Sequence, residues 1–194
     1  MVCASLMSRV LASVVFMLGC AAGCSANVDY IDVEPGVALL KQKNGVVWLR
    51  ARAMSQSGMH YPQVTVSWSV KDPSVAQVDA TGKVTAVKSG RTEVVAKIGS
   101  VTATVPVEVL LAEKMRVEPN PLVLREHGQP VDLRVTVYDY RGRELRDRTV
   151  TFHSLDPKVL TMGTNAAHPG RAGNTQVEVR VDELVDHVNV QVKK

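Results

Sequence analysis

The stretch Val66-Ser67-Trp68-Ser69-Val70-Lys71-Asp72-Pro73-Ser74-Val75-Ala76-Gln77-Val78 contains two signals of a β-protein. Up to Val70 apolar side chains alternate with serine, which predicts a strand with one buried and one solvated face. The Asp-Pro pair then predicts a turn in which the aspartate accepts hydrogen bonds from the turn's own backbone. Trp68 lies in the middle of the apolar face, so we expect this ring in the core.

Alternation with a period of two continues on both sides of this stretch and into the second half of the chain. It is clearest at 47–53, 64–70, 101–109 and 131–137. Glycine, serine and aspartate-proline clusters separate these runs and predict turns. No convincing amphipathic helix is found after residue 25, so we expect about seven short strands in each group of some 80 residues.

An internal repeat organises these strands. Val33-Glu34-Pro35 recurs 84 positions later as Val117-Glu118-Pro119, and Asp72-Pro73 recurs at the same offset as Asp156-Pro157. After the loss of one residue, the offset is 83 for the last two strands. The predicted fold is therefore all-β: two tandem immunoglobulin-like antiparallel β-sandwiches, at 28–111 and 112–194, after an N-terminal signal segment. Their junction at 111–114 is short and lacks glycine and proline, so we expect a semi-rigid pair.

The first repeat resembles the bacterial Ig-like domain, group 2, of the invasin and intimin type. The motifs that carry the resemblance are the Trp68 strand, Asp72-Pro73, the run Gly82-Lys83-Val84-Thr85-Ala86-Val87 and the strand at 94–96, and it covers nearly all of 29–110. The second repeat resembles a degenerate copy that keeps Phe152. Residues 163–173 stand where the first repeat has its glycine-lysine-valine strand. This segment of the second unit is either an eroded strand or a recognition loop, and the sequence leaves both interpretations open.

This resemblance implies a stalk, spacer, adhesive tip or accessory domain, and it brings no catalytic residues. The chain is therefore expected not to be an enzyme and to need no cofactor. The five histidines have no metal-ligand spacing, and all three cysteines fall within residues 1–24, so no metal site is expected. Aromatic residues make up only 4% of the chain and the net charge is +4, which argues against a base-stacking or nucleic-acid surface.

Residues 1–24 resemble a bacterial lipoprotein signal. Arg9 is followed by the apolar run 10–18, which is too short to span a bilayer, and by Gly19-Cys20. The resemblance implies lipidation of Cys20, with Cys24 as the alternative, and sorting to the outer membrane. An ordinary cleaved signal or a buried apolar helix stays open. From Cys20, the ten residues to Tyr30 reach at most about 35 Å, so the first domain is expected near the membrane.

Two segments and one side chain are candidates for binding a partner. The segment 141–148 contains four arginines beside Tyr140, a combination that favours protein interfaces and anionic groups, although a solvated hairpin explains it too. The alternation of side chains places Trp48 on the face that points away from the core. We expect its ring at a domain interface, against a partner, or tucked against its own domain. The candidate partner-binding residues are Trp48, Tyr140, Arg141, Arg143, Arg146, Arg148, His168 and Arg171.

The sequence therefore predicts a non-enzymatic, lipid-anchored cell-envelope protein that acts as a protein-binding or scaffold accessory module. Its expected partners are the membrane, through the lipid, and an envelope protein. A surface adhesin or a carbohydrate-binding accessory protein is the alternative, with a glycan as partner. Two sandwiches end to end span about 80 Å, which is short for an adhesin that must clear a surface polysaccharide. The expected location is the outer membrane, facing the periplasm or the exterior.

Overall fold

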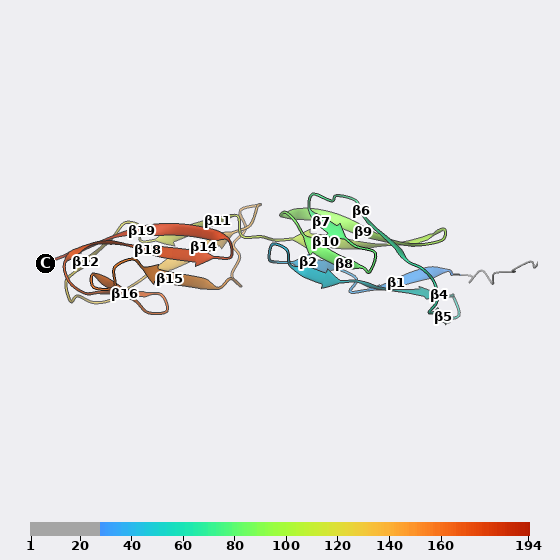
Figure 1. Ribbon diagram of the computed structural model, residues 1–194, viewed down its shortest axis with the longest axis horizontal. Helices are drawn as coiled ribbons and strands as arrows, with labels where there is room; N and C mark the ends of the chain where they lie inside the picture. The colour runs from blue at the N-terminus through green and yellow to red at the C-terminus, as the bar shows by residue number, and fades with distance from the viewer. Residues whose placement is uncertain (1–27) are drawn as a thin grey trace, which may run out of the picture.

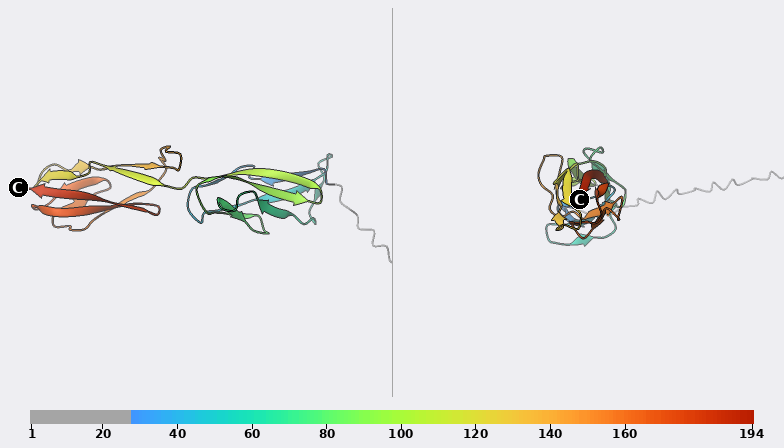
Figure 2. Two further views of the ribbon diagram at one scale, coloured as in Figure 1. Left: turned by 90° about the horizontal axis from the view of Figure 1, so that it is seen from above. Right: turned by 90° about the vertical axis from the view of Figure 1, so that its left-hand side faces the viewer.

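The computed structural model describes residues 28–194, and every regular element in that range is a β-strand. The strands form two elongated sandwiches that lie end to end (Figure 1). Viewed along the long axis, the two sandwiches overlap in a narrow outline (Figure 2). Each sheet draws its strands from one half of the chain. The predicted all-β, immunoglobulin-like fold class is confirmed, while the predicted lipidation of Cys20 or Cys24 falls outside the described residues.

The first sandwich is built from the strands β1 (Tyr30–Glu34), β2 (Ala38–Leu40), β3 (Val46–Trp48), β4 (Arg50–Met54), β5 (His60–Tyr61), β6 (Ser67–Val70), β7 (Ala76–Val78), β8 (Lys83–Ala86), β9 (Gly90–Ile98) and β10 (Val101–Val109). They form a four-stranded sheet in the order β2-β10-β9-β6 and two three-stranded sheets, β1-β4-β5 and β3-β8-β7. The long hairpin of β9 and β10 supplies the two central strands of the largest sheet.

The second sandwich is built from β11 (Lys114–Glu118), β12 (Leu122–Arg125), β13 (Val131–Asp132), β14 (Arg134–Tyr138), β15 (Val150–Ser154), β16 (Leu160–Met162), β17 (Ala166–Pro169), β18 (Gly173–Val181) and β19 (Leu184–Lys193). The sheet orders are β12-β19-β18-β15, β11-β14 and β13-β17-β16, which repeat those of the first sandwich except that β11-β14 lacks a counterpart of β5. The strands β18 and β19 form the corresponding long hairpin. The two halves of the chain therefore share one topology.

Each sandwich departs from a purely antiparallel arrangement at one pair of strands. Strand β2 runs parallel to β10, and β12 runs parallel to β19. In the first sandwich, Pro35 follows the last residue of β1, and a proline has no N–H to offer a β-ladder. The chain then crosses to the other sheet, where it meets the last strand of the domain in the same direction.

The alternating run at 47–53 is not one strand. It divides at Leu49, so that β3 pairs with β8 while β4 pairs with β1 in another sheet. Leu49 is only 2% exposed, and its N–H donates to the Gly82 carbonyl at 2.8 Å. Leu133 occupies the same place in the second repeat, between β13 and β14, and its N–H donates to the Asn165 carbonyl at 2.9 Å. A period of two continues through both breaks, which is why the sequence pattern did not reveal them.

The segment 163–173 contains a strand. From the sequence, this segment could have been either a recognition loop or an eroded strand. Strand β17 pairs with β16 on one side and with β13 on the other. Ala167 is fully buried at the position that Val84 occupies in the first repeat. The strand persists although its side chains have changed, because backbone N–H and C=O groups form the ladder and a small apolar residue still fills the core position.

Aliphatic side chains fill both cores. Trp68 is partly buried and packs against the two apolar clusters of the first sandwich, while Phe152 packs against the cluster of the second. The predicted Asp-Pro turn is present in both copies. Asp72 Oδ1 accepts hydrogen bonds from the Ser74 N–H at 3.0 Å and hydroxyl at 2.6 Å, and these bonds lower the pKa of Asp72. Asp156 Oδ1 accepts from the Lys158 N–H at 2.9 Å.

Among the glycines of the first domain, Gly82 is expected to be the least tolerant of substitution. Its φ is +84°, and a Cβ there would come 2.5 Å from the Leu49 carbonyl oxygen and 3.1 Å from the Trp68 ring. We expect Gly82→Ala to lower the free energy of unfolding by about 2 kcal/mol or more, because strain and a steric clash add. Gly58→Ala is the matched control, since Gly58 has a φ of +82° but open space around it. Tryptophan fluorescence in urea measures both variants, and equal losses would contradict the role of the close contact.

Candidate functional site

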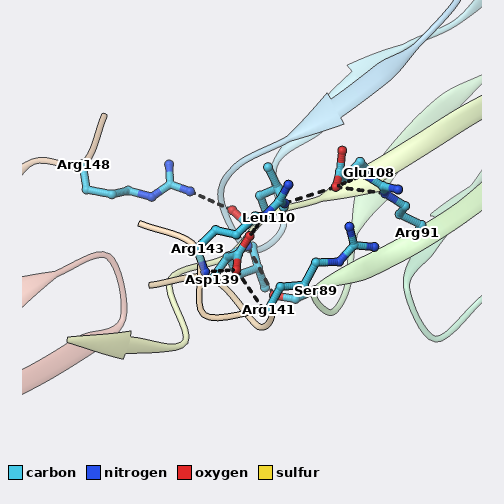
Figure 3. Close-up of polar contacts among 9 residues, drawn as sticks. Ser89, Arg91, Glu108, Leu110, Asp139, Arg141, Arg143 and Arg148 are labelled. Carbon is cyan, nitrogen blue, oxygen red and sulfur yellow. Dashed lines mark hydrogen bonds and ion pairs between the residues drawn. The ribbon is translucent and has the colours of Figure 1, made fainter. Parts of the chain in front are cut away.

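The two sandwiches are joined by a short, hydrogen-bonded connection at residues 110–113, between β10 and β11 (Figure 3). The Leu111 N–H donates to Ser89 Oγ at 3.3 Å, and the Ser89 hydroxyl donates to Glu113 Oε1 at 2.6 Å. The Glu113 N–H donates to the Tyr138 carbonyl at 2.9 Å. The connection is therefore held by the first domain on one side and by the second on the other.

An arginine–carboxylate chain crosses the junction beside this connection (Figure 3). Glu108 Oε1 accepts from Arg91 Nε at 3.0 Å and from an Arg143 amino group at 3.5 Å. Arg143 Nε also donates to Asp139 Oδ2 at 2.8 Å. Arg143 thus links a carboxylate of the first domain to one of the second, and Glu108 and Asp139 raise its pKa through hydrogen bonds and charge.

Asp139 fixes the loop that presents these arginines. Its side chain has no exposed surface, and its Oδ1 accepts the N–H groups of Arg141 at 2.8 Å and Arg143 at 2.9 Å. Desolvation alone would raise the pKa of Asp139. The backbone donors and the Arg143 guanidinium outweigh it, so the pKa lies below its ordinary value.

Arg148 is the buried cation of the junction. Only 5% of its side chain is exposed, and an amino group donates to the Leu110 carbonyl of the connection at 2.7 Å. Its Nε lies 3.2 Å from Asp182 Oδ2, an ion pair without the alignment of a hydrogen bond. Two exposed ion pairs flank it across the junction, Lys41–Asp147 and Lys43–Glu183, and pairs of that kind contribute little by themselves. The buried guanidinium is the stronger element of the contact.

The candidate arginines of 141–148 therefore divide into two groups. The Arg148 side chain is only 5% exposed and contacts the Leu110 carbonyl, and Arg143 is engaged in joining the domains, while partner binding by either residue stays a prediction. Arg146 projects into solvent with 84% of its side chain exposed, and the Arg141 guanidinium lies 5.1 Å from the centre of the Tyr140 ring. Tyr140, Arg141 and Arg146 are the exposed candidates of this region for which no contact across the junction is found.

The remaining candidates lie elsewhere. Trp48 is 56% exposed on β3, with Lys83 Nζ 5.9 Å from the ring centre. His168 is exposed on β17, and Arg171 is exposed in the turn after it, where its N–H donates to the Lys158 carbonyl. That turn belongs to the far end of the second domain, because the His127 N–H next to β12 donates to the Gly170 carbonyl. The eight candidate residues therefore do not form one site.

A surface that the sequence reasoning missed lies on the outward face of the sheet β12-β19-β18-β15. It encloses a hollow of about 690 Å³. Val123, which is 54% exposed, lies on the edge strand β12, and Leu155, which is 53% exposed, directly follows the other edge strand, β15. Amide side chains occupy the central strands, and Gln176 Nε2 donates to Asn189 Oδ1 at 2.8 Å. We call this surface the amide face, and its outward residues are Pro121, Val123, Leu155, Asn174, Gln176, Asn189 and Gln191.

The first repeat carries charges at the equivalent positions. Strand register places Arg91 opposite Glu108 where the second repeat has Asn174 opposite Gln191. Lys71 and Glu93, which form a 2.5 Å ion pair, correspond to Leu155 and Gln176. The second repeat has thus replaced four paired charges by three amides and one leucine. Alignment of the two repeats at offsets of 84 and 83 could have found this signal.

Within residues 28–194, no cluster of three or more histidine, cysteine, aspartate or glutamate side chains is placed to hold a metal ion. The same range contains no helix with the length and apolarity needed to cross a membrane. The geometry of the described chain thus offers binding surfaces, and the amide face is the candidate functional site.

Removing the buried guanidinium should loosen the two domains. Arg148→Ala would leave the Leu110 carbonyl and Asp182 without their cation, at a cost of about 1–3 kcal/mol in domain docking. We expect small-angle X-ray scattering to show a broader range of lengths and proteases to cut faster near residues 110–113. Arg146→Ala, which removes an exposed arginine from the same loop, should change neither, and an unchanged profile for Arg148→Ala would contradict the bracing role.

Asp139 should make the second domain depend on pH. Its folded pKa is below the ordinary 3.8, so its ionised form stabilises the fold above pH 3.8, and this contribution is lost as pH falls through the folded pKa. Asp139→Asn is expected to be less stable than the parent at pH 7, with the difference closing below pH 3.8. Urea unfolding followed by circular dichroism measures this gap, and a gap independent of pH would argue against an ionic role.

Comparison with known proteins agrees with the architecture. Residues 28–109 match the family of bacterial Ig-like domains, group 2. The polysaccharide lyase 8 family protein HylA of Enterococcus faecalis (strain ATCC 700802 / V583) is 37% identical over 67 residues, which is 34% of this chain and 5% of the lyase. The chain thus spans only a small part of the length of this curated relative.

Among solved structures, domains 4 and 5 of the S-layer protein SbsC are 20% identical, with a TM-score of 0.42 over 87% of this chain and 100% of that one. The adhesin InvE of Yersinia pseudotuberculosis is 12% identical, with a TM-score of 0.39 over 84% of this chain and 58% of that one. The match to the group 2 bacterial Ig-like domain thus covers the first sandwich, residues 28–109, which is similar to that family.

Proposed function

We propose that this chain is a non-enzymatic, lipid-anchored protein of the bacterial cell envelope that binds another protein through its second domain. The Ig-like domain at 28–109 supports a place in the envelope, and the lipoprotein-like sequence before Cys20 supports an anchor at the N-terminal end. The outer membrane is the proposed location. The observation that carries the binding role is the amide face, a hollow lined mainly by amide and apolar side chains in one repeat where the other repeat has ion pairs.

The arrangement of the domains supports the same role. The chain enters the first sandwich at the end opposite the second, and the amide face lies beyond the junction on the second sandwich (Figure 1). The contacts of Arg143 and Arg148 brace the junction, so the second domain is held away from the anchor. A braced pair of this kind acts as a short pillar that presents its distal domain to a partner.

The chemistry of the amide face suits protein binding. Val123 and Leu155 provide apolar contact at its edges, and the central amides can each donate and accept hydrogen bonds. Asp156 is the one carboxylate lining the hollow, and its Oδ1 already accepts the Lys158 N–H. The lining residues include no nucleophile paired with a base, so the arrangement supports binding rather than catalysis.

A carbohydrate-binding accessory protein or a surface adhesin is the second candidate function. The row of amides favours it, because amide groups also hydrogen-bond to sugar hydroxyls. The residues that line the hollow include no aromatic ring to stack on a sugar, which favours a protein partner.

The anchor can be tested by growing cells with radiolabelled palmitate. We expect the parent chain to incorporate label and to sediment with outer membranes, and Cys20→Ala to lose both. Cys24→Ala is the matched control for a neighbouring cysteine. Label that persists in Cys20→Ala but is lost in Cys24→Ala would move the anchor to Cys24, and a parent without label would contradict lipid anchoring.

The binding role can be tested with a photoactivatable benzophenone amino acid at Gln176. Illumination of intact cells should join the chain to another protein chain, seen as a larger band on a denaturing gel. The matched control is the same amino acid at Glu93, the corresponding position of the first repeat, where we expect no adduct. Equal yields at the two positions would contradict a specific role for the amide face.

A further inference from the structure

The amide face is self-complementary, a property that its charged counterpart in the first repeat lacks. Each asparagine and glutamine offers both N–H donors and a carbonyl acceptor, and no side chain of the outward set carries a formal charge. Two such sets of residues can therefore meet without like-charge repulsion among them. A twofold interface requires such self-complementarity, because the same patch serves both subunits.

We propose that the protein bound by the amide face is a second copy of this chain; this inference rests on the proposed protein-binding function and names its partner. The two sheets would pack face to face about 10 Å apart, the spacing of stacked sheets. The twofold axis would run along the strands, between the central strands β18 and β19, so that both N-terminal ends lie on the same side, as anchors in one membrane require.

The observed register states which groups would meet. This axis exchanges β18 with β19, and it exchanges the edge strands β12 and β15. Because Gln176 lies opposite Asn189 and Asn174 opposite Gln191 within one sheet, each amide faces an amide of the other copy. The apolar edge residues also match, since the edge with Pro121 and Val123 faces the edge with Leu155 of the second copy.

The next pair of residues along β18 and β19, Glu178 and His187, is also complementary between the two copies. Glu178 lies opposite His187 in the register, and Glu178 is ion-paired to Arg180 at 2.6 Å. The same axis sets His187 of each copy against Glu178 of the other, an arrangement without facing like charges. In the first repeat, by contrast, the pairs Lys71–Glu93 and Arg91–Glu108 each join two charges of one domain, and Glu108 also contacts Arg143 of the second domain. Burying them against a second copy would cost more than it returns.

The first repeat supplies the variant that tests this proposal. Leu155→Lys combined with Gln176→Glu would transfer the Lys71–Glu93 pair to the amide face, on a fold that already accommodates that pair at the same positions. The control is the reverse exchange, Lys71→Leu with Glu93→Gln. Both variants keep the N-terminal segment, so any co-occupancy of one detergent micelle affects them equally. Urea unfolding confirms that each variant is folded.

Full-length chains with two different C-terminal tags are expressed together, extracted in mild detergent and captured through one tag. We expect the parent and the control variant to bring down the second tag, and the Leu155→Lys/Gln176→Glu variant to bring down about tenfold less. Equal co-capture by the parent and the Leu155→Lys/Gln176→Glu variant would overturn the proposal. An adduct of Gln176 with a different protein, without co-capture, would overturn the second copy as partner and leave protein binding standing. Neither adduct nor co-capture would overturn both.

Discussion

The buried guanidinium of Arg148 is the contact on which the architecture of this chain depends. Each sandwich has its own sheets and its own core, so nothing in the sheets themselves sets the angle between them. Arg148 reaches from the second domain to the carbonyl of Leu110 in the connection and stays beside Asp182 in its own domain. A buried cation held in this way is costly to displace, so this contact restricts the movement of the two domains relative to each other.

The residues that brace the junction and the residues of the amide face occupy equivalent positions of the two repeats. At the junction, Arg91 and Glu108 of the first repeat retain their charges and recruit Arg143 from the second. At the equivalent positions the second repeat has amide side chains in place of these charges. The same outward sheet face thus contributes to docking between the domains in the first repeat and carries the proposed partner surface in the second. The two repeats share one strand topology, and they differ in the side chains on this outward sheet face.

Part of the candidate site could be predicted and part could not. The arginine segment 141–148 was found from its composition, but composition does not separate the exposed Arg146 from the buried Arg148 two positions later. The difference depends on contacts distant in the sequence, since Arg148 reaches Leu110 of the connection and Asp182 after β18. The amide face escaped notice because its residues come from four strands and none is unusual by itself. Only the register of β12, β19, β18 and β15 assembles them.

The sequence by itself determined the class of fold, the number of repeats and the turn at each Asp-Pro pair. These features depend on local alternation, on proline and on aspartate, all of which act over a few residues. Tertiary structure decided where Leu49 and Leu133 divide the strands, that residues 166–169 remain a strand, and which arginines are buried. Each of these depends on partners distant in the chain, because a ladder is formed between backbones and burial is set by what packs above a residue.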